Sequence, residues 1–307
     1  MPAKISNWKP TLLPNQSGKY YVITGGNSGI GLEAALILAG KGANITIACR
    51  NPDKAAGAVA KINAAGNGSV DAVMLDLSSM ASIKEAAADI KNRNEMIDGL
   101  INNAGLMQTP QQKTEDGFEL QLGVNHLGHF LWTALLFDRV RPQGGRIVSV
   151  SSNAHKFGRI HLDDLMLEKD YTPTKSYCQS KLANMLFIWE LSRRLQEVGD
   201  RRDAICCHPG YSDTSLQSTG PTGFFKGLYT ITNKVLAQSA ERGAWPTVLA
   251  AAEPRAVTGH YYGPTGFMDC AGPVGDAAIA PQGLDMQAAA KLWKMSEDLI
   301  GMQFRVA

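Results

Sequence analysis

Residues 20–41 read YYVITGGNSGIGLEAALILAGK, and this stretch decides the fold. Tyr20 to Thr24 form a short apolar run typical of a buried strand, and Ile30 to Lys41 carry Ala, Leu and Ile at helical spacing. The glycines between them, in GGNSGIG (25–31), permit a sharp turn, and a purely structural turn is one interpretation. The position between a strand and a helix favours a second interpretation, in which the backbone approaches a pyrophosphate and the helix supplies free N–H groups.

The same alternation of strand and helix continues outward from this unit. Further short β-rich runs occur at 44–49 (NITIAC), 70–75 (VDAVML), 99–102 (GLIN), 146–150 (RIVSV) and 203–207 (DAICC), with helical stretches between them. This pattern predicts an α/β fold of Rossmann type, a doubly wound parallel sheet with helices on both faces. We expect one domain over 1–307. The pattern breaks at 221–227, and we interpret this segment as an excursion from one domain and not as a second domain.

Composition excludes several classes of protein. The 307 residues include 30 Lys plus Arg and 28 Asp plus Glu, a net charge of +2 that is too small to attract nucleic acid. The first 18 residues lack the apolar region of a signal peptide, and no run of about 18 apolar residues could span a membrane. We therefore expect a cytoplasmic protein. The five cysteines show no CxxC pair, so we expect them to be reduced and mostly buried.

The end of the second predicted strand bears on which dinucleotide would bind. An acidic residue there would bind a ribose 2′-OH, but the sequence has Cys49-Arg50-Asn51. Arg50 can hold a 2′-phosphate through charge-assisted hydrogen bonds, which favours NADP(H) over NAD(H), although a solvated surface arginine is the alternative. Asp76 could accept from the adenine amino group or cap a helix that starts near Ser78.

Tyr177 and Lys181 lie four residues apart in YCQSKLANMLFIWEL, a stretch with a helical pattern, so both side chains emerge on one face. A free tyrosine has a pKa near ~10 and exchanges protons poorly at neutral pH, whereas a nearby cation favours the phenolate. Tyr177 is therefore a candidate general acid or base. Such pairs also occur by chance in many helices, so only the surrounding motifs can show whether this pair is catalytic.

The motifs fall in one order along nearly the whole chain. The glycine turn is followed by Asn102-Asn103-Ala104-Gly105, then Asn125, Ser152, the Tyr177/Lys181 pair and Pro209-Gly210. This order resembles the short-chain dehydrogenase/reductase family. The phrases SYCQSKLANMLF and HYYGPTGF, and the separation of 25 residues between Ser152 and Tyr177, are similar to the subgroup of retinol dehydrogenases and protochlorophyllide reductases.

The resemblance implies a dinucleotide-binding half at 18–110, a catalytic and substrate half at 111–307 and a substrate lid at about 211–240. It also implies roles for the matching residues. Ser152 would hydrogen-bond the substrate oxygen, Tyr177 would exchange its proton, and Lys181 would lower the tyrosine pKa and bind the nicotinamide ribose. Asn125 would hold a water that continues the proton relay. The chain departs from the family at Ser212, where an aliphatic residue is more usual, so contacts to the carboxamide are less well defined. The cofactor-binding residues would be Gly25, Asn27, Ser28, Gly29, Ile30, Gly31, Arg50, Asp76, Leu77, Asn103, Ala104, Gly105, Tyr177, Lys181, Pro209, Gly210 and Thr214.

Two other kinds of site are disfavoured. His126 and His129 could face one metal ion, but no carboxylate or cysteine stands nearby at ligand spacing, so we expect no metal. Ser28 in GNSGIG is not the G-x-S-x-G elbow of hydrolases.

We therefore expect an NADP(H)-dependent oxidoreductase that moves a hydride between nicotinamide and the carbonyl or alcohol group of a hydrophobic aldehyde, ketone or alcohol. The apolar residues of 220–238, among them Phe225 and Leu228, could roof such a substrate, or could pack on the core. The alternatives are reduction of a C=C bond and a silent regulatory protein that only binds a dinucleotide. Family members commonly pair through the helices that carry Asn125 and Tyr177, so we expect a homodimer or homotetramer.

Overall fold

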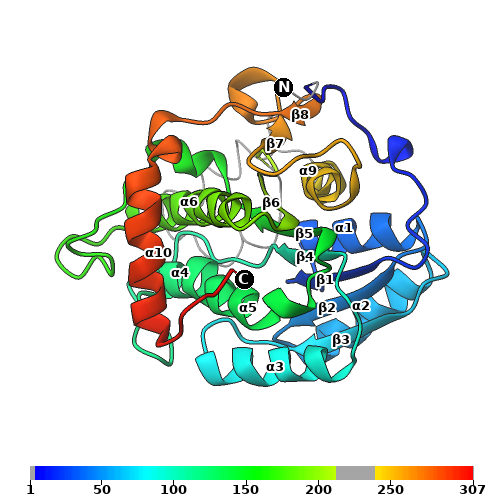
Figure 1. Ribbon diagram of the computed structural model, residues 1–307, viewed down its shortest axis with the longest axis horizontal. Coiled ribbons are helices and arrows are strands. Elements are labelled where there is room, and N and C mark those ends of the chain that lie inside the picture. The colour runs from blue at the N-terminus through cyan, green and yellow to red at the C-terminus, as the bar shows by residue number, and fades with distance from the viewer. Residues whose placement is uncertain (1–3, 212–238, 307) are drawn as a thin grey trace.

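The computed structural model describes residues 4–211 and 239–306, and the strands of these residues form one eight-stranded sheet (Figure 1). The order across the sheet is β3-β2-β1-β4-β5-β6-β7-β8. Strand β1 thus lies between β2 and β4, which makes its carboxyl end the point at which the winding direction reverses. The strands are β1 Tyr20–Thr24, β2 Asn44–Cys49, β3 Val70–Met74, β4 Gly99–Asn102, β5 Gln143–Val150, β6 Arg201–Cys207, β7 Tyr261–Pro264 and β8 Val274–Asp276.

The expected doubly wound parallel sheet is confirmed, and only its last strand departs from the parallel direction. Strands β1 to β7 pair in parallel, but β8 runs antiparallel to β7. The connection over 265–273 folds back on itself, with Thr265 N donating to Pro273 O (2.8 Å) and Gly266 N donating to Ala271 O (3.1 Å). A short connection of this kind can join only antiparallel neighbours, since a parallel pair needs a crossover of a dozen or more residues.

The helices cover both faces of the sheet, as expected from the sequence. One layer holds α1 (Gly29–Ala39), α2 (Pro52–Asn63) and α9 (Ala240–Ala252). The other holds α3 (Met80–Asn92), α5 (Gly128–Leu136) and α6 (Pro173–Glu197), and α10 (Met286–Ile300) packs on α6 from outside. The short helical pieces are η1 Pro10–Leu12, α4 Leu120–Leu122, the π-helical η2 Gly123–Leu127, η3 Phe137–Arg139, η4 Asn153–Phe157, η5 Phe267–Asp269 and η6 Pro281–Leu284.

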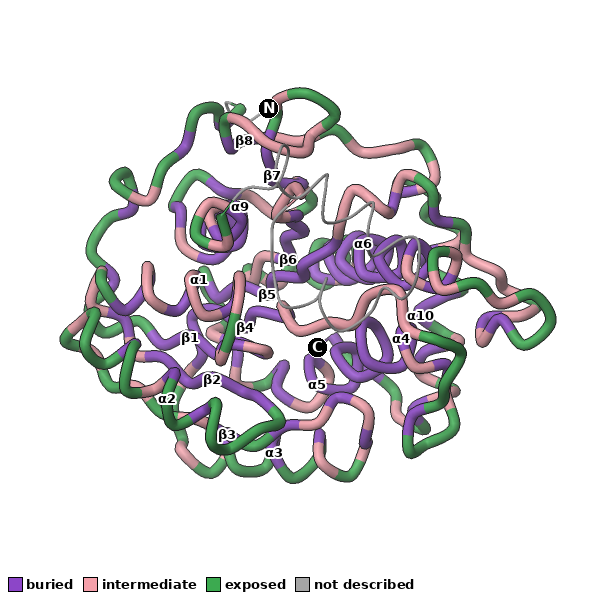
Figure 2. Tube along the Cα trace, turned by 180° about the vertical axis from the view of Figure 1, so that it is seen from behind, coloured by how far each residue is buried: buried purple, intermediate pink, exposed green. Residues whose placement is uncertain are grey.

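Successive residues of a strand pack into two separate hydrophobic cores, one on each face of the sheet. Leu100 and Ile147 pack into the cluster on the α6 side, whereas their neighbours Ile101 and Val148 pack into the cluster on the α1 side. This alternation follows from the two-residue period of a strand, and since both faces are covered the strands are apolar throughout. Figure 2 shows the result, with the central strands and α6 buried and α2 largely exposed.

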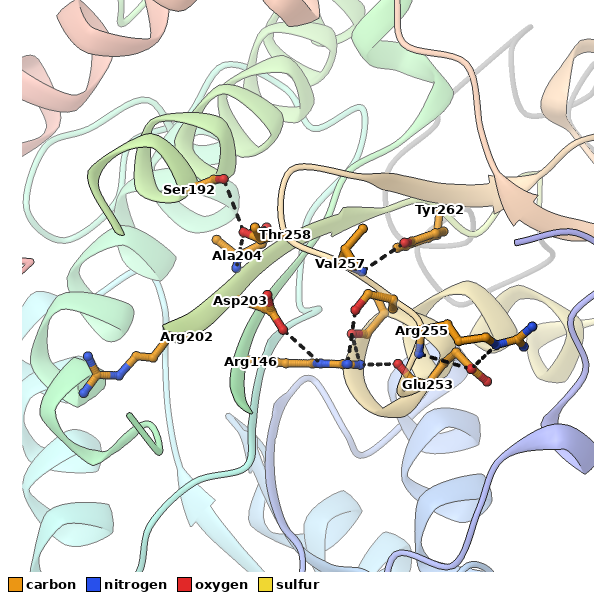
Figure 3. Close-up of polar contacts among 12 residues, drawn as sticks. Arg146, Ser192, Arg202, Asp203, Ala204, Glu253, Arg255, Val257, Thr258 and Tyr262 are labelled. Carbon is orange, nitrogen blue, oxygen red and sulfur yellow. Dashed lines mark hydrogen bonds and ion pairs between the residues drawn. The ribbon is translucent and has the colours of Figure 1, made fainter. Parts of the chain in front are cut away.

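Arg146 fixes the end of α9 to the sheet. Its side chain is buried, and its guanidinium donates to Ala250 O (3.2 Å), Glu253 O (2.8 Å) and Ala256 O (3.2 Å), as Figure 3 shows. Asp203 lies 3.7 Å from Arg146 Nε. The last carbonyl groups of a helix have no hydrogen-bond donor within the helix. Arg146 supplies donors to such carbonyls at the end of α9.

Among residues 4–211 and 239–306, no helix combines the length and the apolar character needed to cross a membrane. The five cysteines are free thiols; Cys49, Cys178, Cys206 and Cys207 are buried and Cys270 is partly so. The expectation of mostly buried, unpaired cysteines is confirmed.

Candidate active site

A cavity of about 950 Å³ lies at the carboxyl ends of the parallel strands. Its volume is at the upper end of the range for small-molecule sites, and it lies where open α/β sheets bind their ligands. Three of the four proposed catalytic residues, Ser152, Tyr177 and Lys181, line it. Thr214 falls outside the described residues. The residues predicted to bind a cofactor that line the cavity are Gly25, Asn27, Ser28, Gly29, Ile30, Gly31, Arg50, Asp76, Leu77, Asn103, Ala104, Gly105, Tyr177, Lys181, Pro209 and Gly210.

The glycine turn is packed so closely that Gly31 has no room for a side chain. Gly25 has φ +69°, and a Cβ on Gly31 would lie 2.5 Å from both Gly25 O and Asn103 Nδ2. Ser28 precedes α1 but makes no side-chain capping bond, unlike Asn51 before α2. The side chain of Ser28 therefore accepts no hydrogen bond from the first N–H groups of α1, which lie at the cavity. These N–H groups could donate to the oxygens of a pyrophosphate. These residues fit a dinucleotide.

Two basic residues, Arg50 and Lys54, line the cavity near the end of β2. Arg50 follows β2, and its Nη1 lies 3.8 Å from Asp76 Oδ2. Lys54, in the first turn of α2, lines the same end, and the sequence reasoning missed it although it stands only four residues after Arg50. Asp76 does not cap α3, whose N-cap is Ser79; instead its Oδ1 accepts from Ser78 N and Ser78 Oγ (2.9 and 2.7 Å). The other carboxylate oxygen of Asp76, Oδ2, is therefore the one that lies near Arg50.

A buried hydrogen-bond chain joins the loop at 103–105, called the cofactor loop here because it is predicted to contact a dinucleotide, to the helical turn that carries Asn125. Thr24 Oγ1 accepts from Asn103 N (2.9 Å) and Ala104 N (3.0 Å) and contacts His129 Nε2 (2.8 Å). His129 Nδ1 lies 3.0 Å from Asn125 O. Because a carbonyl can only accept, Nδ1 carries the hydrogen and Nε2 accepts from the Thr24 hydroxyl. Sequence reasoning did not find this role for Thr24 and His129, since it depends on contacts across 105 residues.

Asn125 does not line the cavity. Its side chain instead hydrogen-bonds the backbone of the loop that follows Gly105. Its Oδ1 accepts from Leu106 N (2.7 Å), and its Nδ2 donates to Leu106 O and Ser180 Oγ (both 2.9 Å). The side chain therefore clamps the loop after Gly105 and has little capacity left for a water. It lies in the π-helical turn Gly123–Leu127, and such turns are frequent at functional sites.

Lys181 is buried next to the cofactor loop. Its Nζ donates to Val150 O (3.1 Å) and lies 5.9 Å from the centre of the Tyr177 ring. A Cβ on Gly105 would lie 3.4 Å from Nζ, which places the loop directly against the ammonium group. Burial lowers the pKa of Lys181 to about 8, because an ammonium group loses hydration inside the protein. Ser151 Oγ donates to Lys181 O (2.7 Å) and ties α6 to the end of β5.

Ser152 stands where β5 ends and η4 begins. Its Oγ accepts from Ala154 N at 3.2 Å, and its carbonyl is 2.7 Å from His155 Nδ1. The opposite wall comes from the end of β6, where Gly210 has φ +73° and its N–H donates to His208 Nδ1 (3.2 Å). A hydroxyl, a phenol and an ammonium thus share one cavity, the set that general acid–base chemistry on a carbonyl or alcohol requires.

The two histidines considered for a metal have separate partners. His126 Nε2 contacts Ser296 Oγ (2.8 Å), whereas His129 contacts Thr24. Within residues 4–211 and 239–306 no group of three His, Cys, Asp or Glu side chains is placed to hold a metal ion. The predicted lid residues Phe225 and Leu228 lie outside the described residues.

A comparison with protein families matches residues 19–222 to the short chain dehydrogenase model. The chain belongs to the short-chain dehydrogenase/reductase family. As a short-chain dehydrogenase/reductase it is an oxidoreductase, and its relatives place it with the retinol dehydrogenase-like subgroup. Human retinol dehydrogenase 13 is 43% identical over 296 residues, which cover 93% of this chain and 86% of that protein. Human retinol dehydrogenase 12 is 38% identical over 290 residues, covering 94% and 88%.

Solved structures of the family share the fold of this short-chain dehydrogenase/reductase. An uncharacterised protein from Mycobacterium paratuberculosis matches with a TM-score of 0.82 and 36% identity, covering 98% of this chain and all of that one. A short chain dehydrogenase from Burkholderia cenocepacia, solved with NADP, matches with a TM-score of 0.63 over 80% of this chain. At 23% identity the second likeness concerns the fold alone.

Proposed function

We propose that the protein is an NADP(H)-dependent oxidoreductase that transfers a hydride between nicotinamide and the carbonyl or alcohol group of a hydrophobic small molecule. The observation that carries the proposal is one continuous cavity with Arg50 and Lys54 at one end and Ser152, Tyr177 and Lys181 at the other. A bound nicotinamide would supply or accept the hydride.

The residues of the chain handle the oxygen and the proton. Ser152 Oγ holds the substrate oxygen by a hydrogen bond, and Tyr177 gives that oxygen a proton during reduction and takes it back during oxidation. The Lys181 ammonium group favours the phenolate form of Tyr177 by its charge and contacts the nicotinamide ribose. Asn125 keeps the loop at Gly105 and Leu106 in place, and its carbonyl, already bonded to His129, has one further lone pair for a relay water.

The proposal predicts that NADPH binds at least about tenfold more tightly than NADH, a difference of about 1.4 kcal/mol. The reason is that a 2′-phosphate can pair with Arg50 and Lys54, and no acid follows β2 to repel it. Arg50→Ala should remove most of the difference while leaving NADH affinity nearly unchanged. Quenching of tryptophan fluorescence during titration with each dinucleotide measures it.

Lys61→Ala is the matched control for Arg50→Ala. Lys61 is an exposed cation in the last turn of α2 and does not line the cavity. Equal affinities for NADPH and NADH in the unaltered protein would contradict the cofactor preference. Unchanged NADPH affinity in Arg50→Ala would remove Arg50 from the site.

The substrate class has separate support. Leu106, Met107, Leu120 and Val124 line the cavity, and the relatives named above are retinol dehydrogenases, whose named substrate is a lipophilic alcohol. A panel of aldehydes, ketones, alcohols and enones with all four nicotinamide cofactors tests the proposal. Turnover of apolar carbonyls or alcohols is the expected result. Turnover of enones alone would indicate C=C reduction, and dinucleotide binding without any turnover would indicate the silent regulatory protein.

Oligomeric state and location remain predictions. Trp293 of α10 packs on Phe130 of α5 and Phe187 of α6, with ring centres 5.0 and 5.8 Å apart. A homodimer or homotetramer that pairs through α5 and α6 would therefore use surface of these helices that α10 leaves free. Gel filtration with light scattering and cell fractionation test pairing and the proposed cytoplasmic location.

A further inference from the structure

Three large apolar side chains are exposed beside the mouth of the cavity. Phe157 is 80% exposed, Phe267 is 81% and Met268 is 67%, which makes them the three most exposed large hydrophobic residues of the described ranges. We call these three residues the apolar rim. Scattered exposed apolar residues are ordinary, but a group next to a functional cavity indicates a binding surface.

Phe157 is continuous with the reacting end of the cavity. It lines the same space as Ser152 and Tyr177, and it ends the 3₁₀ turn η4 for which Ser152 is the N-cap. The turn is held against α6, because Gly158 approaches so closely that an added Cβ would lie 2.5 Å from Cys178 O. The position of Phe157 relative to the catalytic serine is therefore fixed by backbone packing.

The segment that carries the other two rim residues is tied to this turn. Asn153 Nδ2 donates to Met268 O (3.3 Å) and Asp269 O (2.8 Å), and Lys156 Nζ lies 2.6 Å from Asp269 Oδ2. The next residue, Cys270, lines the cavity. Met268 and Asp269 both have positive φ, at 52° and 54°, a strained conformation that costs free energy and clusters at functional sites.

We infer that the apolar rim binds the hydrocarbon body of the substrate where it extends outward from the carbonyl or alcohol held by Ser152 and Tyr177, with Phe157 as its principal contact. This inference rests on the proposed function and deepens it, since it selects substrates with a long apolar tail. Covering exposed apolar side chains with a hydrocarbon tail removes both surfaces from water, which favours binding roughly in proportion to the area covered.

The test compares two aldehydes that differ only in tail length. With NADPH, the ratio of kcat/KM for decanal to that for propanal should fall about fivefold in Phe157→Ala, because the longer tail reaches the rim and the shorter one does not. Phe157→Leu should keep most of the ratio. Leu12→Ala is the control, as Leu12 is 56% exposed in the N-terminal turn η1 and lies outside the cavity lining.

A binding measurement separates this inference from the proposed function. Titration calorimetry of 1-decanol into the protein loaded with NADPH, a pair that cannot react, should show about fivefold weaker binding in Phe157→Ala than in the unaltered chain. Decanol binding with this pattern but no turnover of either aldehyde would overturn the proposed function and leave the inference standing. Turnover with an unchanged decanal to propanal ratio in Phe157→Ala would overturn the inference alone. Absence of both decanol binding and turnover would overturn both.

Two further outcomes would assign the rim to other occupants. An equal loss for propanal and decanal in Phe157→Ala would show that Phe157 supports the chain's own structure. Sedimentation with phosphatidylcholine and phosphatidylserine vesicles that is lost in Phe157→Ala and Phe267→Ala, with an unchanged aldehyde ratio, would show that the rim contacts a lipid surface. Either result would overturn the inference.

Discussion

Tyr177→Phe is expected to lower kcat by about 10²-fold or more while NADPH still binds. The substitution removes the hydroxyl that exchanges a proton with the substrate oxygen and keeps the ring, so it removes general acid–base catalysis and little else. Steady-state rates with the best aldehyde of the panel give kcat, and fluorescence titration gives the NADPH dissociation constant.

The same chemical change elsewhere provides the control. Tyr20→Phe deletes a hydroxyl that hydrogen-bonds Thr46 Oγ1 (2.8 Å) in the sheet, so it should lower stability and leave kcat within about twofold. Lys181→Ala should impair both turnover and NADPH binding, since the ammonium group is proposed to serve both. More than half of the original activity in Tyr177→Phe would show that the assigned mechanism is wrong.

Acid is expected to destabilise the fold well before its carboxylates are protonated. Burial lowers the pKa of His126 to about 3, of His129 to about 4 and of His208 to about 3. In the unfolded chain these histidines take up protons near pH 6.5, whereas in the native state they stay neutral. The unfolded state then binds more protons, so stability is complete above pH 6.5 and falls by up to about 4 kcal/mol per pH unit for the three together.

The hydrogen bonds explain why these rings resist protonation. His208 Nδ1 accepts from Gly210 N, and His129 Nε2 accepts from Thr24, so an added proton would replace an acceptor by a donor. Ser296 Oγ donates to Leu292 O and accepts from His126 Nε2, which leaves His126 Nδ1 buried with no partner among the described residues. A proton on that nitrogen would be an unpaired buried charge.

Urea unfolding at pH 7.5, 6.0 and 5.0 measures the effect. The unfolding free energy should fall steeply below pH 6.5, and His126→Gln should lower the slope by about a third. His161→Gln, at a partly exposed position, should change the slope much less. An unfolding free energy that stays constant from pH 7.5 to 5.0 would contradict the neutral state of the three histidines.

Local features made most of the fold predictable. The strand, glycine turn and helix at 20–41 are adjacent in the sequence, so their geometry follows from backbone freedom at Gly25 and from apolar periodicity. The Tyr177/Lys181 pair was predictable for the same reason, because one helix, α6, carries both residues. The structure confirmed the alternating strands and helices within a few residues at each end, with β5 and β6 beginning earlier than expected.

The wrong or incomplete expectations concern contacts that local patterns do not specify, some between neighbouring residues and some between distant segments. The antiparallel β8 could not be read from three residues, since its direction depends on the return over 265–273. The Asp76 carboxylate accepts hydrogen bonds from Ser78 and does not cap a helix, because α3 begins at Met80 and its N-cap is Ser79. The clamp that Asn125 forms on Leu106 likewise depends on packing between two segments 19 residues apart.

The α/β class, the family resemblance and the residue types of the site could be predicted from the amino-acid sequence, because turn geometry, helical spacing and motif order can be read along the chain. The three-dimensional contacts were needed to learn which of those residues share a cavity, how Thr24 and His129 connect the cofactor loop to Asn125, and where the apolar rim lies. The physical reason is that burial and hydrogen bonding depend on which strands become neighbours. Placing β1 between β2 and β4 brings the ends of segments from 24 to 270 together, and no local pattern contains that order.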